Sequence, residues 1–261
     1  MTHTARAAVV GALILTPLLT ALSGCCCPSE EEMAKMKEQQ EAKLAAQKDE
    51  IKSYYKKLKK IKKNIPDDLK QKKCSSKAIA SAQKDAAFGG RLMTLDVESL
   101  DYLTASTFDE GRKRELEPWK WIRSREVAEL RHVDDIPDAT IAGFVLDDIE
   151  KAKKQPLFGV IVSERRSMPV VPEGTSDFTV GHYDGWIVVV AQKTGKPVCQ
   201  VAFSATNSDT IAYKKGKLMG DQYNAEEATR DDFLENFEKS ANGALDKIGK
   251  GLRVNLGLFQ L

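Results

Sequence analysis

A long helical pattern follows the first residues of the chain. From Ser29 to Ile65 the sequence contains no Gly and no Pro and is rich in Ala, Glu, Gln, Lys and Met, which all favour helices. Ser29 with Glu32 three residues later is the pattern of a capping box, so we expect the helix to begin there. Pro66 marks its end. The pattern predicts one helix over 29–65, roughly 50 Å long at about 1.5 Å per residue.

This predicted helix carries a short heptad repeat. Apolar residues recur every seven positions and again three residues further on, at Leu44, Ile51, Tyr54, Leu58, Ile61 and Ile65. One interpretation is a coiled-coil stem through which the 29–65 helix self-associates. The other is a monomeric spacer helix that lies against a globular domain. Because Gln40 and Gln47 interrupt an already short repeat, we favour the spacer.

The rest of the chain mixes helical and strand patterns. Apolar stripes predict four helices, over 75–88, 118–130, 137–154 and 224–248. Short apolar runs typical of strands occupy 157–162, 186–190 and 198–203, and the strictly alternating tail 252–258 predicts an edge strand. Residues 91–117 fit either structure. The fold class that these patterns predict is α+β: a small antiparallel sheet covered by helices, preceded by a long N-terminal helical spacer.

The first 25 residues carry the pattern of an export signal. His3 and Arg6 precede an uncharged apolar run, residues 7–22. A membrane-spanning helix needs about 20 apolar residues, whereas this run is shorter and broken by Pro and Gly, as in a secretory signal peptide. The sequence LSGC follows at residues 22–25. It resembles the lipobox of bacterial lipoproteins, in which an aliphatic residue and two small residues precede a cysteine.

The resemblance implies a lipid anchor. Cleavage would follow Gly24, and Cys25 would become the diacylglyceryl-modified first residue, attached to a membrane. Cys26 stands where the family's retention signal has Asp, which favours the outer membrane. The roles of Cys26 and Cys27 stay open. The implied organisation is a lipoprotein signal peptide (1–24), a lipidated N-terminus with a Lys-rich stalk (25–73) and an α+β globular domain (74–261).

Charge is concentrated in the stalk. The whole chain has 40 basic and 38 acidic residues, a balance that argues against a dedicated nucleic-acid binder. The segment from Lys52 to Lys73 nevertheless contains ten lysines, with Asp67 and Asp68 as the acidic residues among them. It is either a solvated helix face or a surface attracted to anionic lipid phosphates or acidic glycan of the envelope.

The cysteines suggest a disulfide. Three adjacent cysteines cannot readily chelate one zinc ion, because zinc sites separate their ligands with residues that turn the sulfurs inward. Residues 193–196 predict a hairpin turn between the strands 186–190 and 198–203. In an oxidising periplasm Cys74 and Cys199 are a candidate pair that would tie the base of the stalk to this predicted hairpin. The alternative is that Cys199 is an inert thiol buried in its strand.

The histidines give weak indications of chemistry. His132 precedes two aspartates in RHVDD, which is either a cation site or, more commonly, a polar loop between helices in which Asp135 caps the next helix. His182 and Asp184 could form an acid–base pair. The chain contains no nucleophile elbow, zinc-protease, P-loop or dinucleotide motif. We therefore assign no catalytic residue, cofactor or metal from the sequence.

The predicted function follows from the predicted cellular location and the predicted domain organisation. We expect a membrane-anchored cell-envelope lipoprotein with a binding or structural module that faces the periplasm or the cell surface. The alternative is an envelope enzyme acting on glycan or peptide, with His132, His182 or Asp184 in its site. A flat apolar patch would favour the first, and a pocket with a shifted titratable group would favour the second.

Overall fold

The long N-terminal helix begins where the capping box predicts. A computed structural model of the chain describes residues 29–83, 90–116, 129–173, 175, 177–211 and 221–254. In it helix α1 spans Glu30–Lys63. The backbone N–H of Ser29 donates to Oε2 of Glu32 at 2.8 Å, and the N–H of Glu32 donates to Oγ of Ser29 at 3.3 Å. The hydrogen bond from the Ser29 backbone lowers the pKa of the Glu32 carboxyl.

The chain divides into two compact units, residues 1–38 and residues 39–261. Everything below concerns the second unit, which we call the domain. Several sequence predictions lie outside the described residues. These are the signal segment with Cys25, Cys26 and Cys27, almost all of the 118–130 helix, and the end of the predicted tail strand beyond Val254.

The second half of α1 belongs to the domain core. Its buried residues share one side of the helix and are Ile51, Tyr54, Tyr55, Leu58 and Ile61. They form one hydrophobic cluster with residues of the sheet and of other helices. The heptad positions in this half of α1 therefore pack inside the domain itself.

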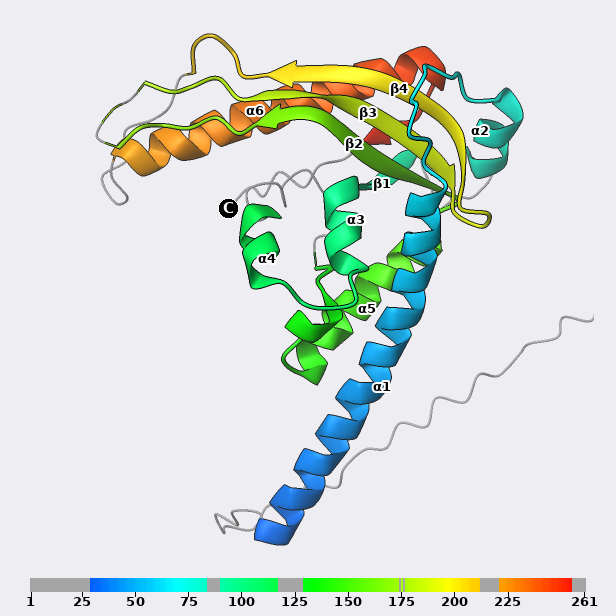
Figure 1. Ribbon diagram of the computed structural model, residues 1–261, viewed down its shortest axis with the longest axis vertical. Coiled ribbons are helices and arrows are strands. Elements are labelled where there is room, and N and C mark those ends of the chain that lie inside the picture. Colours follow the sequence, from blue (N-terminus) through cyan, green and yellow to red (C-terminus); the bar gives the residue numbers. More distant parts are fainter. Residues whose placement is uncertain are drawn as a thin grey trace, which may run out of the picture. The chain divides into compact units, whose positions relative to one another are not determined.

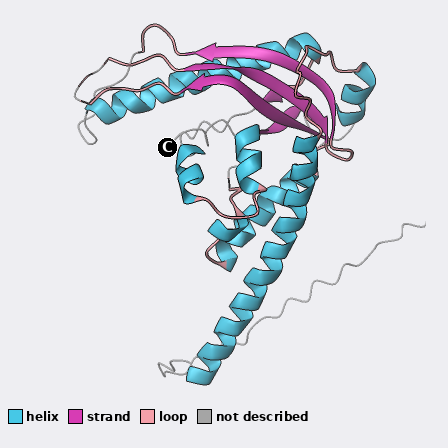
Figure 2. Cartoon of the chain, viewed as in Figure 1, coloured by secondary structure: helices cyan, strands magenta, loops and turns pink. Residues whose placement is uncertain are grey.

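The five-stranded sheet has the order β4-β3-β2-β1-β5 (Figures 1 and 2). Its strands are β1 Arg91–Asp96, β2 Leu157–Ser167, β3 His182–Ala191, β4 Lys196–Thr206 and β5 Arg253–Val254. Strands β2, β3 and β4 are antiparallel neighbours, as the predicted hairpin requires. The turn before β4 contains Gly195 with a φ of 67°, the left-handed conformation that glycine adopts easily.

The prediction of a small antiparallel sheet was wrong, because β1 pairs in parallel with β2 and β5 pairs in parallel with β1. The sheet is therefore mixed. The ambiguous segment 91–117 contains the missing strand β1, followed by α3 Val97–Leu103 and α4 Glu110–Leu116. A connection long enough to include helices can return the chain to the same end of the sheet, which is what parallel pairing needs.

The remaining helices are α2 Ser76–Gln83, α5 Ala139–Lys153 and α6 Asp221–Ile248. The predicted stripe of α6 is confirmed, since all its members are buried: Leu234, Phe237, Ala241, Leu245 and Ile248. The side chain of Asp138 caps α5 by accepting from the backbone N–H groups of Thr140 and Ile141. Phe144 of α5 is 50% exposed, because the helix buries Val145 and Ile149.

The sheet lies between two layers of helices. Helices α6 and α2 contribute to the hydrophobic cluster on one face, and α1, α3 and α5 to the cluster on the other (Figure 1). On the α6 side the ring of Phe237 meets those of Tyr183 and Phe203, with both centroid distances at 4.9 Å. The core therefore has two parts, and α1 is needed to complete one of them.

The burial of α1 can be tested with Leu58→Ala. Leu58 is 1% exposed, so its truncation should leave a cavity and lower the free energy of unfolding by about 2–5 kcal/mol. Urea unfolding of the full chain measures this. Lys59→Ala changes an exposed neighbour on the same helix and should stay within about 0.5 kcal/mol of the wild type. Equal stability of the two variants would contradict the packing of α1 in the core.

Candidate functional site

None of the described helices covers one part of one face of the three long strands. In the second half of β4 exposed and buried residues alternate, and β3 alternates in the same way over its first residues. We call the uncovered surface the open face. Strand register places its residues side by side: Arg165, His182, Asp184, Trp186, Ala202, Ser204 and Thr206. Its opposite side is buried under α6.

Asp184 lies at the centre of the polar residues on the open face. Nε2 of His182 lies 2.5 Å from Oδ2 of Asp184. Ser204 lies directly opposite Asp184 on β4. The neighbouring Ser204 hydroxyl first, and then His182, lower the pKa of Asp184, and the charge of Arg165 adds to the effect. The predicted pairing of His182 with Asp184 thus has a third member that the sequence did not indicate.

This arrangement differs from a nucleophilic triad. In a triad the histidine lies between the nucleophile and the carboxylate, so that it can take the nucleophile's proton. Here Asp184 lies between His182, to which it is hydrogen-bonded, and Ser204, its partner on β4. The geometry suits recognition of polar groups at a surface. The exposed rim also holds Trp186, whose Nε1–H donates to Oε1 of Glu164 at 2.7 Å.

His132 has a structural role. The side chain is 1% exposed, and its Nδ1 accepts from the backbone N–H of Asp134 at 3.2 Å. Nε2 lies 3.2 Å from the carbonyl oxygen of Ala105, so it carries the proton that this carbonyl accepts. Both ring nitrogens are used, and the ring packs against Tyr102 and Phe108. Within the described residues no group of three potential metal ligands comes together.

A buried acidic cluster at the end of β1 was missed by the sequence analysis. Asp96 is 1% exposed and accepts from the backbone N–H of Ser99 at 2.8 Å, which caps α3. Glu98 lies 3.4 Å from a guanidinium nitrogen of Arg166. Burial raises the pKa of Glu98, and Arg166 opposes that shift. The sequence signal for this cluster was Asp96, a residue type that commonly caps the start of a helix. It was overlooked because 91–117 fits both helix and strand.

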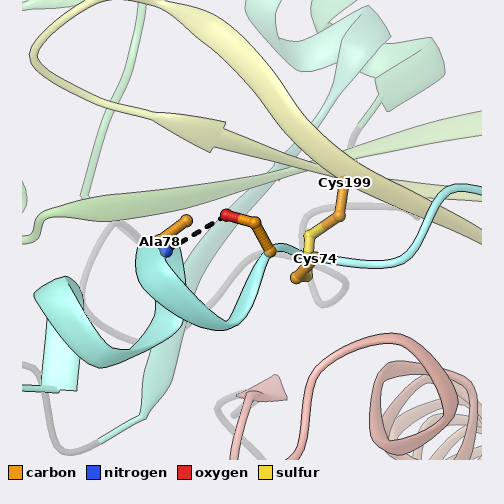
Figure 3. Close-up of a disulfide and its surroundings, with 4 residues drawn as sticks. Cys74, Ala78 and Cys199 are labelled. Atoms are coloured by element: carbon orange, nitrogen blue, oxygen red, sulfur yellow. Dashed lines mark hydrogen bonds between the residues drawn. A yellow bond between two sulfur atoms is a disulfide. The ribbon is translucent and has the colours of Figure 1, made fainter.

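The segment between α1 and α2 is fastened to β4 and α6. A disulfide joins Cys74 to Cys199, with a Cα–Cα distance of 4.6 Å (Figure 3). Lys72 and Gln200 exchange backbone hydrogen bonds of 2.9 and 3.0 Å, and the N–H of Cys74 donates to the carbonyl of Ile248 at 2.9 Å. The candidate pair of the sequence analysis thus lies at a junction of three elements. Just beyond it, the N–H of Ala78 donates to Ser75 at the start of α2.

The lysines of the stalk are exposed. Of the ten between Lys52 and Lys73, all but the partly buried Lys62 are exposed. Lys62 forms an ion pair with Asp101 of α3. Within the described chain no ion pair is formed by Lys56, Lys59 or Lys63, which follow one another on a single side of α1. This side presents unneutralised positive charge to the solvent.

A shallow hollow lies between the end of β4 and α6. Its volume is about 400 Å³, and its lining is mostly polar: Ser204, Ala205, Thr206, Asn207, Asn236, Lys239 and Ser240. Asn207 closes one end. Its amide donates to the carbonyl of Thr229 at 2.7 Å and accepts from the N–H of Gly181 at 2.8 Å. These bonds fix the chain after β4 against α6.

The comparisons with known proteins assign no family. No family model matches the chain, and no similar protein was found among curated proteins or among solved structures. The described helices include none with the length and apolar composition needed to cross a bilayer. The function must therefore be argued from the residues themselves.

The disulfide can be tested with Cys74→Ala/Cys199→Ala. The bridge spans 125 residues, so its loss should lower the free energy of unfolding by about 3–5 kcal/mol, because a long closed loop restricts the unfolded chain. Urea unfolding of the full chain measures this. Treating the wild type with a reducing agent should reproduce the effect and leave the variant unchanged. Alkylation of Cys74 and Cys199 in the folded, unreduced protein would contradict the bridge.

The hydrogen bonds of Asp184 can be tested by Asp184→Asn. Because the pKa of Asp184 is lowered in the folded protein, the carboxylate stabilises the fold above its ordinary pKa of about 3.9. That stability is lost as the pH falls through the lowered pKa. We expect the variant to be less stable than the wild type at pH 6 and the difference to vanish near pH 2. The same exchange at the exposed Asp67 should give no such convergence. A pH-independent difference at Asp184 would contradict the assignment.

Proposed function

We propose that the chain is a membrane-anchored lipoprotein of the cell envelope, whose domain is a binding or structural module. The observation that carries the proposal is the sequence LSGC at residues 22–25, placed after a charged start and an uncharged apolar run. Cys25 would bear the lipid. Several acyl chains hold a protein durably at a membrane, since each buried methylene contributes about 0.8 kcal/mol.

The Cys74–Cys199 disulfide supports export independently of the N-terminal pattern. Disulfides persist in oxidising compartments such as the periplasm and are rare in the cytosol. The bridge fastens the base of α1 to the sheet and to the end of α6. A module tethered through its N-terminus gains from such a connection, because the tether then leads directly into the folded domain. Cys26 after the lipidated residue favours the outer membrane as destination.

The exposed lysines of α1 support a second contact with the envelope. Lys56, Lys59 and Lys63 present a positive side near the end of the helix. We propose that this side is attracted to anionic lipid phosphates or acidic glycan, an attraction that weakens with salt. Self-association of the 29–65 helix would have to use its first half, because the apolar residues of the second half are in the domain core.

No specific observation favours the enzyme alternative. Among the described residues, His132 has both ring nitrogens engaged inside the core, and His182 is hydrogen-bonded to Asp184 on an open surface. The polar open face, with the indole of Trp186 half-buried at its rim, supports recognition of a partner.

The anchor can be tested with Cys25→Ser. In a bacterial host fed labelled palmitate, the wild-type chain should be labelled and should pellet with membranes, whereas the variant should lose the label. Cys26→Ser is the matched control, since it removes a neighbouring thiol and should keep both the label and the fractionation of the wild type. Unchanged labelling of Cys25→Ser would refute the lipid anchor.

A further inference from the structure

The outer edge of β4 has backbone groups that point away from the sheet. β4 is the last of the described strands in the order, with β3 on one side and, among the described residues, no strand along its full length on the other. Lys72 and Gln200 exchange both of their backbone hydrogen bonds on this outer side. Because orientation alternates along a strand, the N–H and C=O groups of Ala202, Ser204 and Thr206 also point outward. Within the described residues no backbone group pairs with them there.

This stretch lacks the usual protection of an exposed edge. Natural sheets blunt such edges with lysine, proline, bulges or a covering segment. Residues 201–206 read VAFSAT and contain neither a charge nor a proline. The register shift in β4 lies earlier, between the partners of Val189 and Val190, so the outward half is regular. The single bridge at Lys72 shows that the same edge accepts an extended segment.

A polar flank of α6 borders the unpaired stretch. The hollow of about 400 Å³ is lined by Ser204 and Thr206 on the edge and by Asn236, Lys239 and Ser240 on α6. Figure 1 shows α6 running alongside the strands, with β4 as the outer one. A strand added to β4 would place every second side chain toward this flank.

The positive charge of two lysines on this flank of α6 favours an acidic segment as the added strand. Lys239 is exposed and has no ion pair among the described residues. Lys247 follows Ser240 by seven residues, so it lies on the same stripe of the helix two turns further on. A carboxylate on the added strand would meet the positive charge of Lys239 and the hydroxyl of Ser240. These lie one turn beyond Asn236, whose amide already donates to Asp232 and Ser208.

We propose that the outer edge of β4 and the adjacent flank of α6 bind an extended acidic peptide, which adds a strand to the sheet. Backbone hydrogen bonds to Ala202, Ser204 and Thr206 supply affinity, and an acidic side chain facing Lys239 supplies selectivity, as in other cases of strand addition. The inference does not depend on the lipid anchor, because it rests on the domain alone.

The test uses labelled peptides of defined chemistry. An octapeptide that alternates valine and glutamate is titrated with the full chain in detergent, and binding is followed by fluorescence anisotropy. It should bind saturably. The same peptide with N-methyl groups on alternate amides should bind at least tenfold more weakly, because it cannot pair along the edge. A peptide with lysine in place of glutamate should also bind at least tenfold more weakly.

Two variants locate the peptide. Ser204→Pro removes one outward N–H and should weaken binding at least tenfold, whereas Ser204→Ala keeps that N–H and should bind more tightly than Ser204→Pro. Lys239→Glu should weaken binding of the glutamate peptide and strengthen that of the lysine peptide. Lys193→Glu makes the same charge change in the turn before β4 and should alter neither. Lys239→Glu and its control Lys193→Glu change exposed residues, so this comparison keeps the test valid if Ser204→Pro fails to fold.

Three results would overturn the proposal. The first is no saturable binding of the glutamate peptide, and the second is binding that N-methylation or Ser204→Pro leaves unchanged. The third is a wild-type chain that sediments as a dimer and becomes a monomer in Ser204→Pro, since a second copy would then occupy the edge.

Discussion

The burial of the long strands on both faces is the constraint on which the fold depends. The half of the sheet that contains the start of β2, the end of β3 and the start of β4 is apolar on both sides. This half therefore needs two layers of helices. Helix α6 supplies one layer, and the second half of α1 contributes to the other together with α3 and α5. The segment that sequence composition marks as a charged stalk therefore serves the core with residues such as Ile51 and Leu58.

The same constraint determines where the domain can interact. Beyond the reach of α1 and α5 the described helices cover one face of the strands, and the strand side chains alternate between the α6 core and the solvent. The polar network around Asp184, the hollow beside α6 and the unpaired edge of β4 all lie in this region. Ser204 belongs to all three. It lies opposite Asp184, it lines the hollow, and its backbone groups lie on the unpaired edge.

Sequence patterns predicted the elements with strong local signals, and the failures were non-local. The capping box at Ser29, the α6 stripe and the β3–β4 hairpin each depend on residues close in sequence. The direction of β1 depends on a crossover that no local pattern records, and segment 91–117 fits two structures at once. In the same way His182 and Asp184 could be paired from their spacing. Ser204 could not, because strand register alone brings it opposite Asp184.

The position of the disulfide has a mechanical consequence. A pull on the N-terminus would act along α1 and would first load the packing of Ile61, Leu58 and Ile51, in that part of the helix which is buried. If α1 gave way, the chain could lengthen only as far as Cys74. The 125-residue loop closed by Cys74 and Cys199 cannot be drawn out while the covalent bond holds. The bridge thus sets a limit on extension, so that β1, β2 and β3, which lie within the closed loop, are not drawn out by such a pull.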